Sequence, residues 1–200
     1  MQKPFKLLSK EIYKMYIFFG KRLFDIFFAS ILIIFLFPFL LIIGILIKAF
    51  DPGPIIFCQK RLGLNEKPFK LYKFRSMPIN ICDIPSDQLV NLNLTWIGRF
   101  IRRTNIDELP QLYNIFIGDM SFVGPRPSLE SQIELIKIRK ENYVFLCKPG
   151  LTGLAQISSF DGMNVTEKAN LDTRYAKLIS LKKDILIILK TFSYLLKKPP

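Results

Sequence analysis

The chain has 200 residues, with 29 lysines and arginines against 16 aspartates and glutamates, and its formal net charge is +13. That excess predicts an anionic partner: a nucleic acid, an anionic membrane surface or a phosphorylated substrate. Because the chain has no histidine and its three cysteines form no CxxC pair, a structural zinc site is excluded, and a bound metal should be a hard ion held by oxygen, such as Mg²⁺.

The first predicted elements are membrane-associated. In residues 1–20, Phe5, Leu8 and Ile12 share one helical face and lysines lie elsewhere, so we expect an interfacial amphipathic lead-in. Residues 26–47 form an almost uninterrupted apolar run. At about 1.5 Å per residue a helix over this run would reach roughly 33 Å, which is enough to span a bilayer.

Two topologies remain open for the apolar run. Pro38 stands near its middle, where it removes a backbone hydrogen bond and bends a helix. Basic residues flank both sides, Lys21 and Arg22 before the run and Lys48 after it. The positive-inside rule places both flanks in the cytoplasm only if the helix turns at Pro38 and leaves on the same face. The residues alone favour a kinked spanning helix and a re-entrant helix about equally.

A hairpin and a short helix are expected next. Residues 55–60 and residues 69–75, which alternate apolar and polar side chains, predict two strands joined by a turn over residues 61–68. Residues 78–93 have the composition of a surface loop, and residues 94–103 predict a short basic helix. Lys73 and Arg75 share one face of the second strand, which is either a phosphate-binding face or a solvated one.

Two adjacent carboxylates, Asp107 and Glu108, follow that basic helix at the predicted start of another. Leu109 and Leu112 begin its apolar stripe, and Pro110 is tolerated in a first turn. The positive end of a helix would hold a carboxylate ionised, and an ionised carboxylate can act as a nucleophile. The alternative is that Asp107 only caps the helix, which is the commoner role of such residues.

The remaining chain predicts helices separated by glycine- and proline-rich turns. Residues 118–121 end the helix that follows the carboxylates, and residues 122–127 form a rigid turn. Residues 129–146 are expected to be helical, residues 148–157 to form a glycine-rich turn followed by a short strand, and residues 169–196 to form a final helical region, amphipathic in its later part.

Several basic side chains accompany the carboxylate pair in the sequence, and Arg126 is the most specific of them. Prolines on both sides restrict its backbone, so its guanidinium is aimed before a ligand binds. A fixed guanidinium fork matches two phosphate oxygens. The alternative is a structural ion pair with Asp119 or Glu130.

These motifs together resemble those of the monotopic phosphoglycosyl transferases, bacterial enzymes that start glycan assembly on a polyprenyl phosphate. The matching segments, in chain order, are Lys21-Arg22-Leu23-Phe24-Asp25, Arg61-Leu62-Gly63, Tyr72-Lys73-Phe74-Arg75-Ser76-Met77, Asp107-Glu108-Leu109-Pro110-Gln111-Leu112, Gly118-Asp119-Met120-Ser121, Gly124-Pro125-Arg126-Pro127, Lys148-Pro149-Gly150-Leu151-Thr152-Gly153-Leu154-Ala155-Gln156, and Asp172 with Tyr175. They cover residues 20–190, and the chain is most similar to the small single-domain members.

The resemblance implies an α+β fold with three parts: the lead-in at residues 1–20, a re-entrant membrane helix at residues 21–50 kinked at Pro38, and a catalytic domain at residues 51–200 with a short hairpin and interfacial helices. It also implies residue roles. Asp107 would be the nucleophile, with Glu108 beside it and both acids holding Mg²⁺. Phosphate groups would bind Lys73, Arg75, Arg102 and Arg126, and the nucleotide or sugar would bind Gln156, Asp172 and Tyr175.

The implied reaction moves a sugar-1-phosphate from a UDP-sugar to polyprenyl phosphate and releases UMP through a phosphosugar–aspartyl intermediate. The implied partners are those two substrates and membrane lipids, without nucleic acid, at the cytoplasmic face of the bacterial inner membrane. A rival interpretation is a non-catalytic adaptor whose basic faces bind anionic lipid or nucleic acid. Paired carboxylates among phosphate-binding residues oppose that rival, since a polyanion-binding surface would avoid them.

Overall fold

The computed structural model describes residues 16–77, 95–158 and 163–197. The predicted lead-in and the predicted loop at residues 78–93 therefore fall almost entirely outside the described residues. The elements in chain order are a π-helical turn η1 (Tyr16–Gly20), α2 (Lys21–Phe50), β1 (Ile56–Leu62), η2 (Leu64–Glu66), β2 (Pro68–Phe74), α3 (Trp96–Arg103), η4 (Ile106–Glu108), α4 (Gln111–Ile117), β3 (Ser121–Val123), α5 (Ile133–Glu141), η5 (Val144–Leu146), β4 (Gly150–Thr152), α6 (Leu154–Ser158), α7 (Val165–Ala176) and α8 (Leu181–Lys197). The mixture of helices and small sheets confirms the predicted combination of α and β structure.

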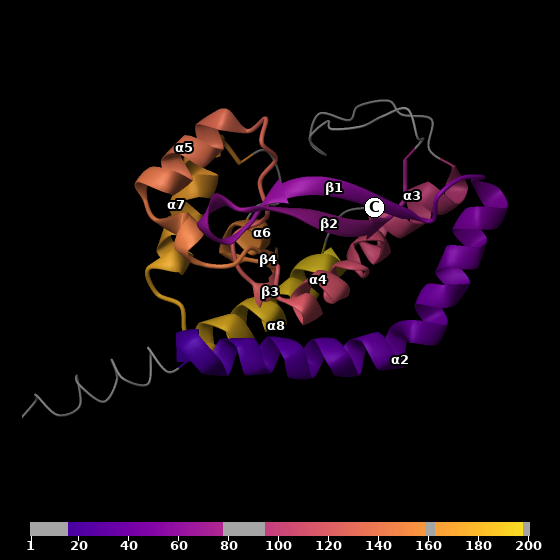
Figure 1. The fold of residues 1–200 in the computed structure, drawn as a ribbon, viewed down its shortest axis with the longest axis horizontal. Helices are drawn as coiled ribbons and strands as arrows, with labels where there is room; N and C mark the ends of the chain where they lie inside the picture. Colours follow the sequence, from indigo (N-terminus) through magenta and orange to yellow (C-terminus); the bar gives the residue numbers. More distant parts are fainter. Residues whose placement is uncertain (1–15, 78–94, 159–162, 198–200) are drawn as a thin grey trace, which may run out of the picture.

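Helix α2 is the one helix of the described residues that is long and apolar enough to cross a membrane. It contains Pro38, and Figure 1 shows that it bends partway along its length. Proline explains a bend of this kind because it lacks the N–H that would bond one turn back. The predicted single apolar helix with a proline inside it is confirmed.

Both halves of α2 pack against the same globular body. In the first half, Ala29 joins a buried cluster with Leu112 and Ile115 of α4. In the second half, Ile43 and Ile47 join a separate cluster with α3 and the hairpin. Much of the remaining surface of α2 is exposed and apolar, including Ile34, Phe35 and Phe37. The helix therefore lines one edge of the molecule rather than projecting away from it (Figure 1).

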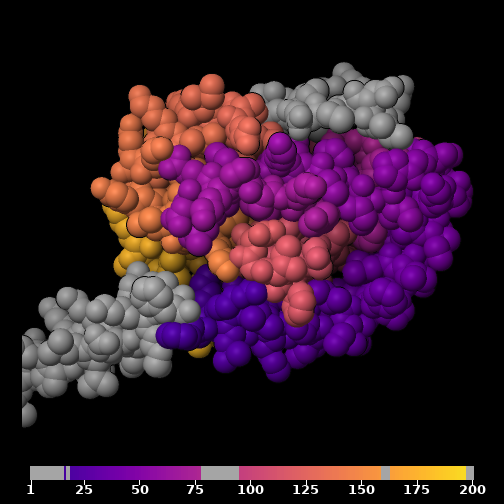
Figure 2. Space-filling model, viewed as in Figure 1, coloured from indigo at the N-terminus to yellow at the C-terminus, as the bar shows by residue number. Residues whose placement is uncertain are grey.

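Strands β1 and β2 form the predicted antiparallel hairpin, with η2 in its turn. Gln59 pairs with Leu71 on the buried face, whereas Lys60 pairs with Lys70 on the exposed face. The buried face covers α4, so that α4 lies between the hairpin and α2, as Figures 1 and 2 show. This arrangement brings the inward side chains of β2 toward the turn that precedes α4.

A second sheet was not predicted. Strands β3 and β4 pair in parallel, Ser121 with Gly150 and Val123 with Thr152. Their backbones approach closely at glycines: a Cβ atom at Gly150 would lie 2.0 Å from the backbone nitrogen of Gly124. Glycine is required at such a position because any side chain would collide with the neighbouring strand.

Two predictions for residues 129–157 need correction. The helix expected over residues 129–146 is confined to α5 and the short turn η5. The short strand expected at the end of residues 148–157 is not found there: Leu154–Ser158 form α6, and the strand lies earlier, at β4. A short apolar run such as residues 154–157 has no period long enough to distinguish the two.

The final helical region is two helices. Helix α7 begins at Val165 because Asn164 caps it: the Asn164 side chain accepts a bond from the backbone of Glu167, whose carboxylate accepts one from Asn164 in return. Helix α7 ends at Ala176 and α8 starts at Leu181. Residues 177–180 separate them, so α8 runs in a direction of its own (Figure 1).

Candidate active site

Asp107 and Glu108 lie in the 3₁₀ turn η4, one turn before the helix that was expected to begin with them. The backbone of Asn105 is left-handed, with φ of 55°, and reverses the chain as it leaves α3. Pro110 is the residue before the first turn of α4, which begins at Gln111. The expectation that the N-terminus of this helix holds the carboxylates is therefore wrong, because the extra turn separates them from its free N–H groups.

Glu108 is held by two cations. Its Oε1 atom accepts a hydrogen bond from Lys73 Nζ at 2.7 Å and another from Arg126 Nη2 at 2.7 Å. Burial alone would raise the pKa of Glu108, but Arg126 and Lys73 outweigh burial and hold it well below its ordinary range. Glu108 is therefore ionised throughout the neutral range. It joins β2 and η4 to the turn at residues 125–128, which we call the Arg126 turn.

The pKa of Asp107 shifts in the opposite direction from that of Glu108. The Asp107 side chain is 8% exposed, and no side chain in the described part of the chain donates a hydrogen bond to it. Burial, reinforced by the negative charge of Glu108, raises the pKa of Asp107 to about 6, against the opposing effects of Lys73, Arg126 and Arg102. The carboxylate is thus mainly ionised at neutral pH but poorly solvated, which is the condition of a reactive oxygen nucleophile.

The Arg126 turn is fixed by hydrogen bonds to four successive backbone carbonyls. The oxygens of Pro125, Arg126, Pro127 and Ser128 accept bonds from Gly150 N, Arg139 Nη1, Arg61 Nη1 and Leu62 N respectively, at 2.9, 2.9, 3.1 and 3.0 Å. The interaction with Glu108 raises the pKa of Arg126 further above its ordinary value. The partner of Arg126 is thus Glu108, neither Asp119 nor Glu130, and its backbone is held as the flanking prolines predict.

The predicted phosphate-binding residues do not all gather here. Lys73 contacts Glu108, whereas Arg75 is buried against Asp51, whose carboxylate lies 3.0 Å from Arg75 Nη2 and whose backbone oxygen also accepts from that guanidinium. Strand β2 ends between them, at Phe74. Arg102 Nη1 lies 3.2 Å from the sulfur of Met77, near enough to Asp107 to affect its pKa.

Asp172 and Tyr175, predicted to bind nucleotide or sugar, are buried away from the carboxylate pair. Asp172 forms an ion pair with Arg139, with Oδ2 2.5 Å from Nη2 and 3.0 Å from Nε. Because Arg139 also donates to the carbonyl of Arg126, Asp172 supports the Arg126 turn indirectly. Arg139 was missed by sequence reasoning, since a lone arginine in a predicted helix gives no sign that it will be 1% exposed.

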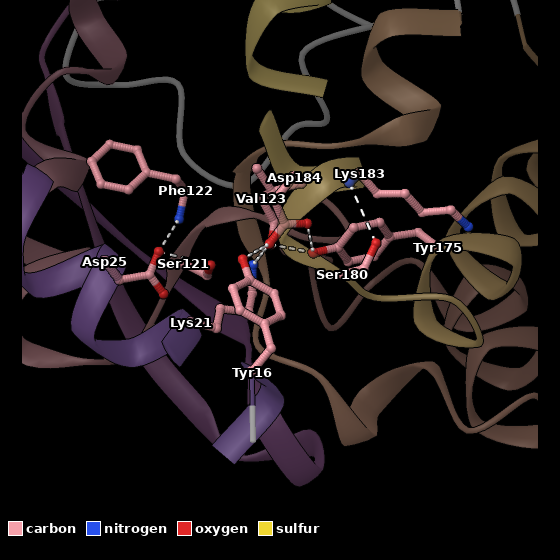
Figure 3. Close-up of polar contacts among 10 residues, drawn as sticks. All are labelled: Tyr16, Lys21, Asp25, Ser121, Phe122, Val123, Tyr175, Ser180, Lys183 and Asp184. Carbon is pink, nitrogen blue, oxygen red and sulfur yellow. Dashed lines mark hydrogen bonds and ion pairs between the residues drawn. The ribbon is translucent and has the colours of Figure 1, made fainter. Parts of the chain in front are cut away.

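Tyr175 belongs to a buried cluster around Asp184, shown in Figure 3. The carboxylate of Asp184 lies 2.7 Å from the hydroxyl of Tyr16, 2.5 Å from Nζ of Lys21 and 2.8 Å from the hydroxyl of Tyr175. Tyr175 also lies 2.9 Å from the carbonyl oxygen of Val123. The cluster joins the starts of α2 and α8, which makes Asp184 a second residue that sequence reasoning missed.

A pocket of about 760 Å³ lies beside the carboxylate pair. Its polar lining includes Glu108, Arg126 and Gln156, while Asp107 stands between two lining residues, Ile106 and Glu108. Gln156 was a predicted ligand contact; its Nε2 donates to the carbonyl of Leu151, and its Oε1 is buried without a partner in the described residues. The volume falls in the range of small-molecule sites.

Comparison with known proteins places this geometry in a family. A family model described as "Bacterial sugar transferase" matches residues 16–198. The chain is similar to a UDP-glucose:undecaprenyl-phosphate glucose-1-phosphate transferase of Klebsiella pneumoniae, with 38% identity over 180 residues, which are 86% of this chain and 39% of that protein. It is similar to an undecaprenyl-phosphate galactose phosphotransferase of Salmonella typhimurium, with 34% identity over 197 residues, 90% of this chain and 41% of that protein.

A shorter relative is matched over more of its length. A UDP-glucose:undecaprenyl-phosphate glucose-1-phosphate transferase of Caulobacter vibrioides is 37% identical over 185 residues, which are 88% of this chain and 69% of that protein. The chain spans less than half of the Klebsiella and Salmonella proteins. The match nevertheless includes α2, both carboxylates, the Arg126 turn and α8, and on that extent the chain belongs to the bacterial sugar transferase family.

Proposed function

We propose that the protein transfers a sugar-1-phosphate from a UDP-sugar to polyprenyl phosphate. The observation that carries the proposal is the placement of Asp107, a buried carboxylate of raised pKa, next to Glu108, whose charge is neutralised by Lys73 and Arg126, beside a pocket. The names of the relatives supply the donor and acceptor classes. We attribute the net positive charge of the chain to the binding of these phosphates and of the membrane surface, and not to the binding of nucleic acid.

In the first step, an Oδ atom of Asp107 attacks the β-phosphorus of the UDP-sugar. The new bond joins Asp107 to that phosphorus, the bridging bond to the α-phosphate breaks, and UMP leaves with the bridging oxygen. Arg126 and Lys73 stabilise the charge that accumulates on the phosphate oxygens, as fixed cations do in phosphoryl transfer. Their existing contacts with Glu108 keep them aimed at this position.

In the second step, a phosphate oxygen of polyprenyl phosphate attacks the phosphorus held on Asp107. The bond from phosphorus to Asp107 breaks, the carboxylate is regenerated, and polyprenyl-diphospho-sugar leaves. Dividing the transfer in this way lets two anionic substrates use one set of cations in turn, because UMP departs before the second phosphate arrives.

Mg²⁺ fits this site as a substrate-bound ion. Among the described residues, no three or more acidic, cysteine or histidine side chains converge on one point, so an all-protein cage is absent from that part of the chain. Mg²⁺ ordinarily binds through one or two carboxylates plus substrate phosphates, and Asp107 and Glu108 supply such a pair. Bound there, the ion would neutralise the diphosphate.

The proposed location is the cytoplasmic face of the bacterial inner membrane. Helix α2 would enter the membrane and leave it on that same face. Two observations support this: both flanks of the apolar run are basic, and both halves of α2 pack on the same body. The exposed apolar side chains of α2 and of α8, such as Phe35 and Leu189, would contact lipid. A cytosolic sugar nucleotide and a lipid phosphate could then meet at the interface.

The direct test is UMP release. Purified protein should be incubated with Mg²⁺, polyprenyl phosphate and each member of a panel of UDP-sugars. One or a few UDP-sugars should give stoichiometric UMP and polyprenyl-diphospho-sugar. Release of neither product from any donor, by protein that remains folded, would contradict the proposal.

A further inference from the structure

The pocket beside Glu108 is lined by side chains of two kinds. Charged or polar side chains, among them Glu108, Arg126 and Gln156, form part of the lining. Two separate helices add aliphatic and aromatic side chains: Leu32 and Leu36 of α2 and Ile188, Phe192 and Leu195 of α8. Tyr194 of α8 also lines the pocket and lies near enough to Arg126 to affect its pKa, so this part of α8 lies close to the phosphate-binding cations.

Helix α8 is held in place as a wall of the pocket. At its start, Asp184 is fixed by Tyr16, Lys21 and Tyr175. In its middle, the Oγ1 atom of Thr191 lies 2.7 Å from Oγ1 of Thr152 in β4. These contacts hold residues 192–195 of α8 beside the pocket, although their side chains are partly exposed.

The same two helices carry much of the exposed apolar surface. Phe192 is 65% exposed although it lines the pocket, and Leu196 next to the pocket is 88% exposed. On α2, Phe35 is exposed while its neighbour Leu36 lines the pocket. The apolar lining that α2 and α8 give the pocket is thus continuous with an exposed apolar surface, which is suited to lipid.

We propose that the groove between α2 and α8 binds the isoprenoid units nearest the phosphate of the acceptor, and that Leu195 and its neighbours on α8 determine acceptor affinity. This inference rests on the proposed function. The acceptor enters laterally from the bilayer, and its phosphate reaches Arg126 while its first isoprenoid units remain between the two helices.

The chemistry of the groove favours a lipid over the nucleotide part of the donor. Uracil and ribose bind through directional hydrogen bonds, which the side chains of Leu32, Leu36 and Leu195 cannot supply. An isoprenoid chain needs only apolar contact.

Leu195 and Leu196 offer a matched pair of substitutions. They are adjacent in α8, but only Leu195 lines the pocket, at 41% exposure, while Leu196 is 88% exposed. Leu195→Ser and Leu196→Ser make the same chemical change, and because Leu196 is the more exposed of the two, its substitution removes at least as much apolar surface from contact with the membrane. Each half-reaction should be measured separately for both variants: adduct formation with UDP-sugar alone, and transfer from the adduct to polyprenyl phosphate.

For Leu195→Ser we expect adduct formation within about twofold of wild type and a KM for polyprenyl phosphate raised roughly tenfold, as when a pocket loses an apolar contact. Leu196→Ser should match wild type in both steps. Equal effects of the two substitutions on the acceptor KM, or a loss confined to adduct formation in Leu195→Ser, would overturn the groove assignment. If wild type forms no adduct, the proposed function fails, and the groove is judged by the labelling experiment alone.

Labelling tests the groove without turnover. A polyprenyl phosphate with a photoreactive group on its first isoprenoid unit should label wild-type protein in the tryptic peptide of residues 191–197, which lies between Lys190 and Lys197. Excess unlabelled polyprenyl phosphate should suppress this labelling, and excess of a membrane lipid should not. Labelling confined to α3 or α4 would overturn the assignment.

Discussion

The carboxyl groups of Asp107 and Glu108 are adjacent in the chain, yet their pKa values move in opposite directions from the ordinary range. Burial raises the pKa of Asp107 to about 6, while Arg126 and Lys73 hold the pKa of Glu108 low. Pairs of carboxylates separated in this way commonly have different chemical roles. In the proposed mechanism Glu108 is the fixed anion that orients Lys73 and Arg126, and Asp107 is the group that reacts.

Adduct formation should depend on the ionisation of Asp107. Only the carboxylate can attack phosphorus, so the single-turnover rate with UDP-sugar should rise with pH and level off above an apparent pKa of about 6. Rapid-quench measurements of UMP release between about pH 5 and pH 8 would show this. A rate independent of pH over that interval would exclude Asp107 as the group that titrates.

Replacing Asp107 should abolish activity and stabilise the fold. Because the folded pKa of about 6 exceeds the ordinary 3.8, protonated Asp107 contributes stability below about pH 4 that is lost as the pH rises through 6. The ionised side chain therefore costs about 3 kcal/mol at pH 8. Asp107→Asn removes that cost, so denaturant unfolding at pH 8 should show a more stable protein.

The same variant should form no adduct. Intact mass spectrometry of wild type with UDP-sugar should show the added phosphosugar, and Asp107→Asn should show none. Glu108→Gln is the matched control for stability: it leaves Lys73 and Arg126 without their carboxylate and should destabilise the fold. An active Asp107→Asn protein would refute the assignment of the nucleophile.

Arg126→Lys should not restore function. An ammonium group cannot make the two parallel bonds that a guanidinium makes to phosphate. We expect transition-state stabilisation to fall by about 2–4 kcal/mol, measured as kcat/KM for the UDP-sugar. The fold should survive, because the turn is held by its carbonyls and not by the guanidinium. A kcat/KM close to wild type would mean that Arg126 contributes charge alone.

Asp184→Asn should destabilise the protein and leave Asp107, Glu108 and Arg126 unchanged. The carboxylate is buried and paired with Lys21, and removing its charge leaves that ammonium uncompensated. Breaking a buried pair costs about 3–5 kcal/mol, which should appear as a large fall in Tm. Glu141→Gln, at an exposed acid on α5, is the control and should leave Tm unchanged. Equal Tm values for wild type and Asp184→Asn would mean that the Asp184 cluster contributes little to the stability of the fold.

Topology can be tested with single cysteines. In a variant without Cys58, Cys82 and Cys147, cysteines placed at Ser9 and Asn65 should both resist a membrane-impermeant thiol reagent in intact cells and react after permeabilisation. This result is expected because basic residues flank both sides of the apolar run. Labelling at Ser9 alone in intact cells would show that α2 spans the membrane.

The local features of the fold could be predicted from the sequence. The alternation in residues 69–75 predicts β2, and the apolar run with its proline predicts α2. Arg126 between two prolines was a good candidate because its rigidity is a property of neighbours in the sequence. Its partner was not predictable, since Glu108 reaches it only when η4 and the Arg126 turn are brought together.

The incorrect predictions concern residues whose contacts come from parts of the chain that are far away in the sequence. Arg75 shares a strand face with Lys73 in the sequence pattern, but β2 ends at Phe74 and Asp51 binds Arg75 instead. Tyr175 was assigned to the ligand, and burial with Asp184 places it elsewhere. Strands β3 and β4 are too short for a periodic signal, and their pairing depends on the close approach of Gly124 and Gly150, which are 26 residues apart in the sequence.

The contacts of Asp184 also set an order of events during synthesis. Its partners Tyr16 and Lys21 precede it by 168 and 163 residues. The apolar helix α2 therefore leaves the ribosome long before the residue that fixes its beginning has been translated. The hairpin, α3 and α4, on which both halves of α2 pack, are complete by Ile117, so α2 can dock on them before Asp184 is made. The docking of α8 onto the start of α2 is then the last of these contacts to form.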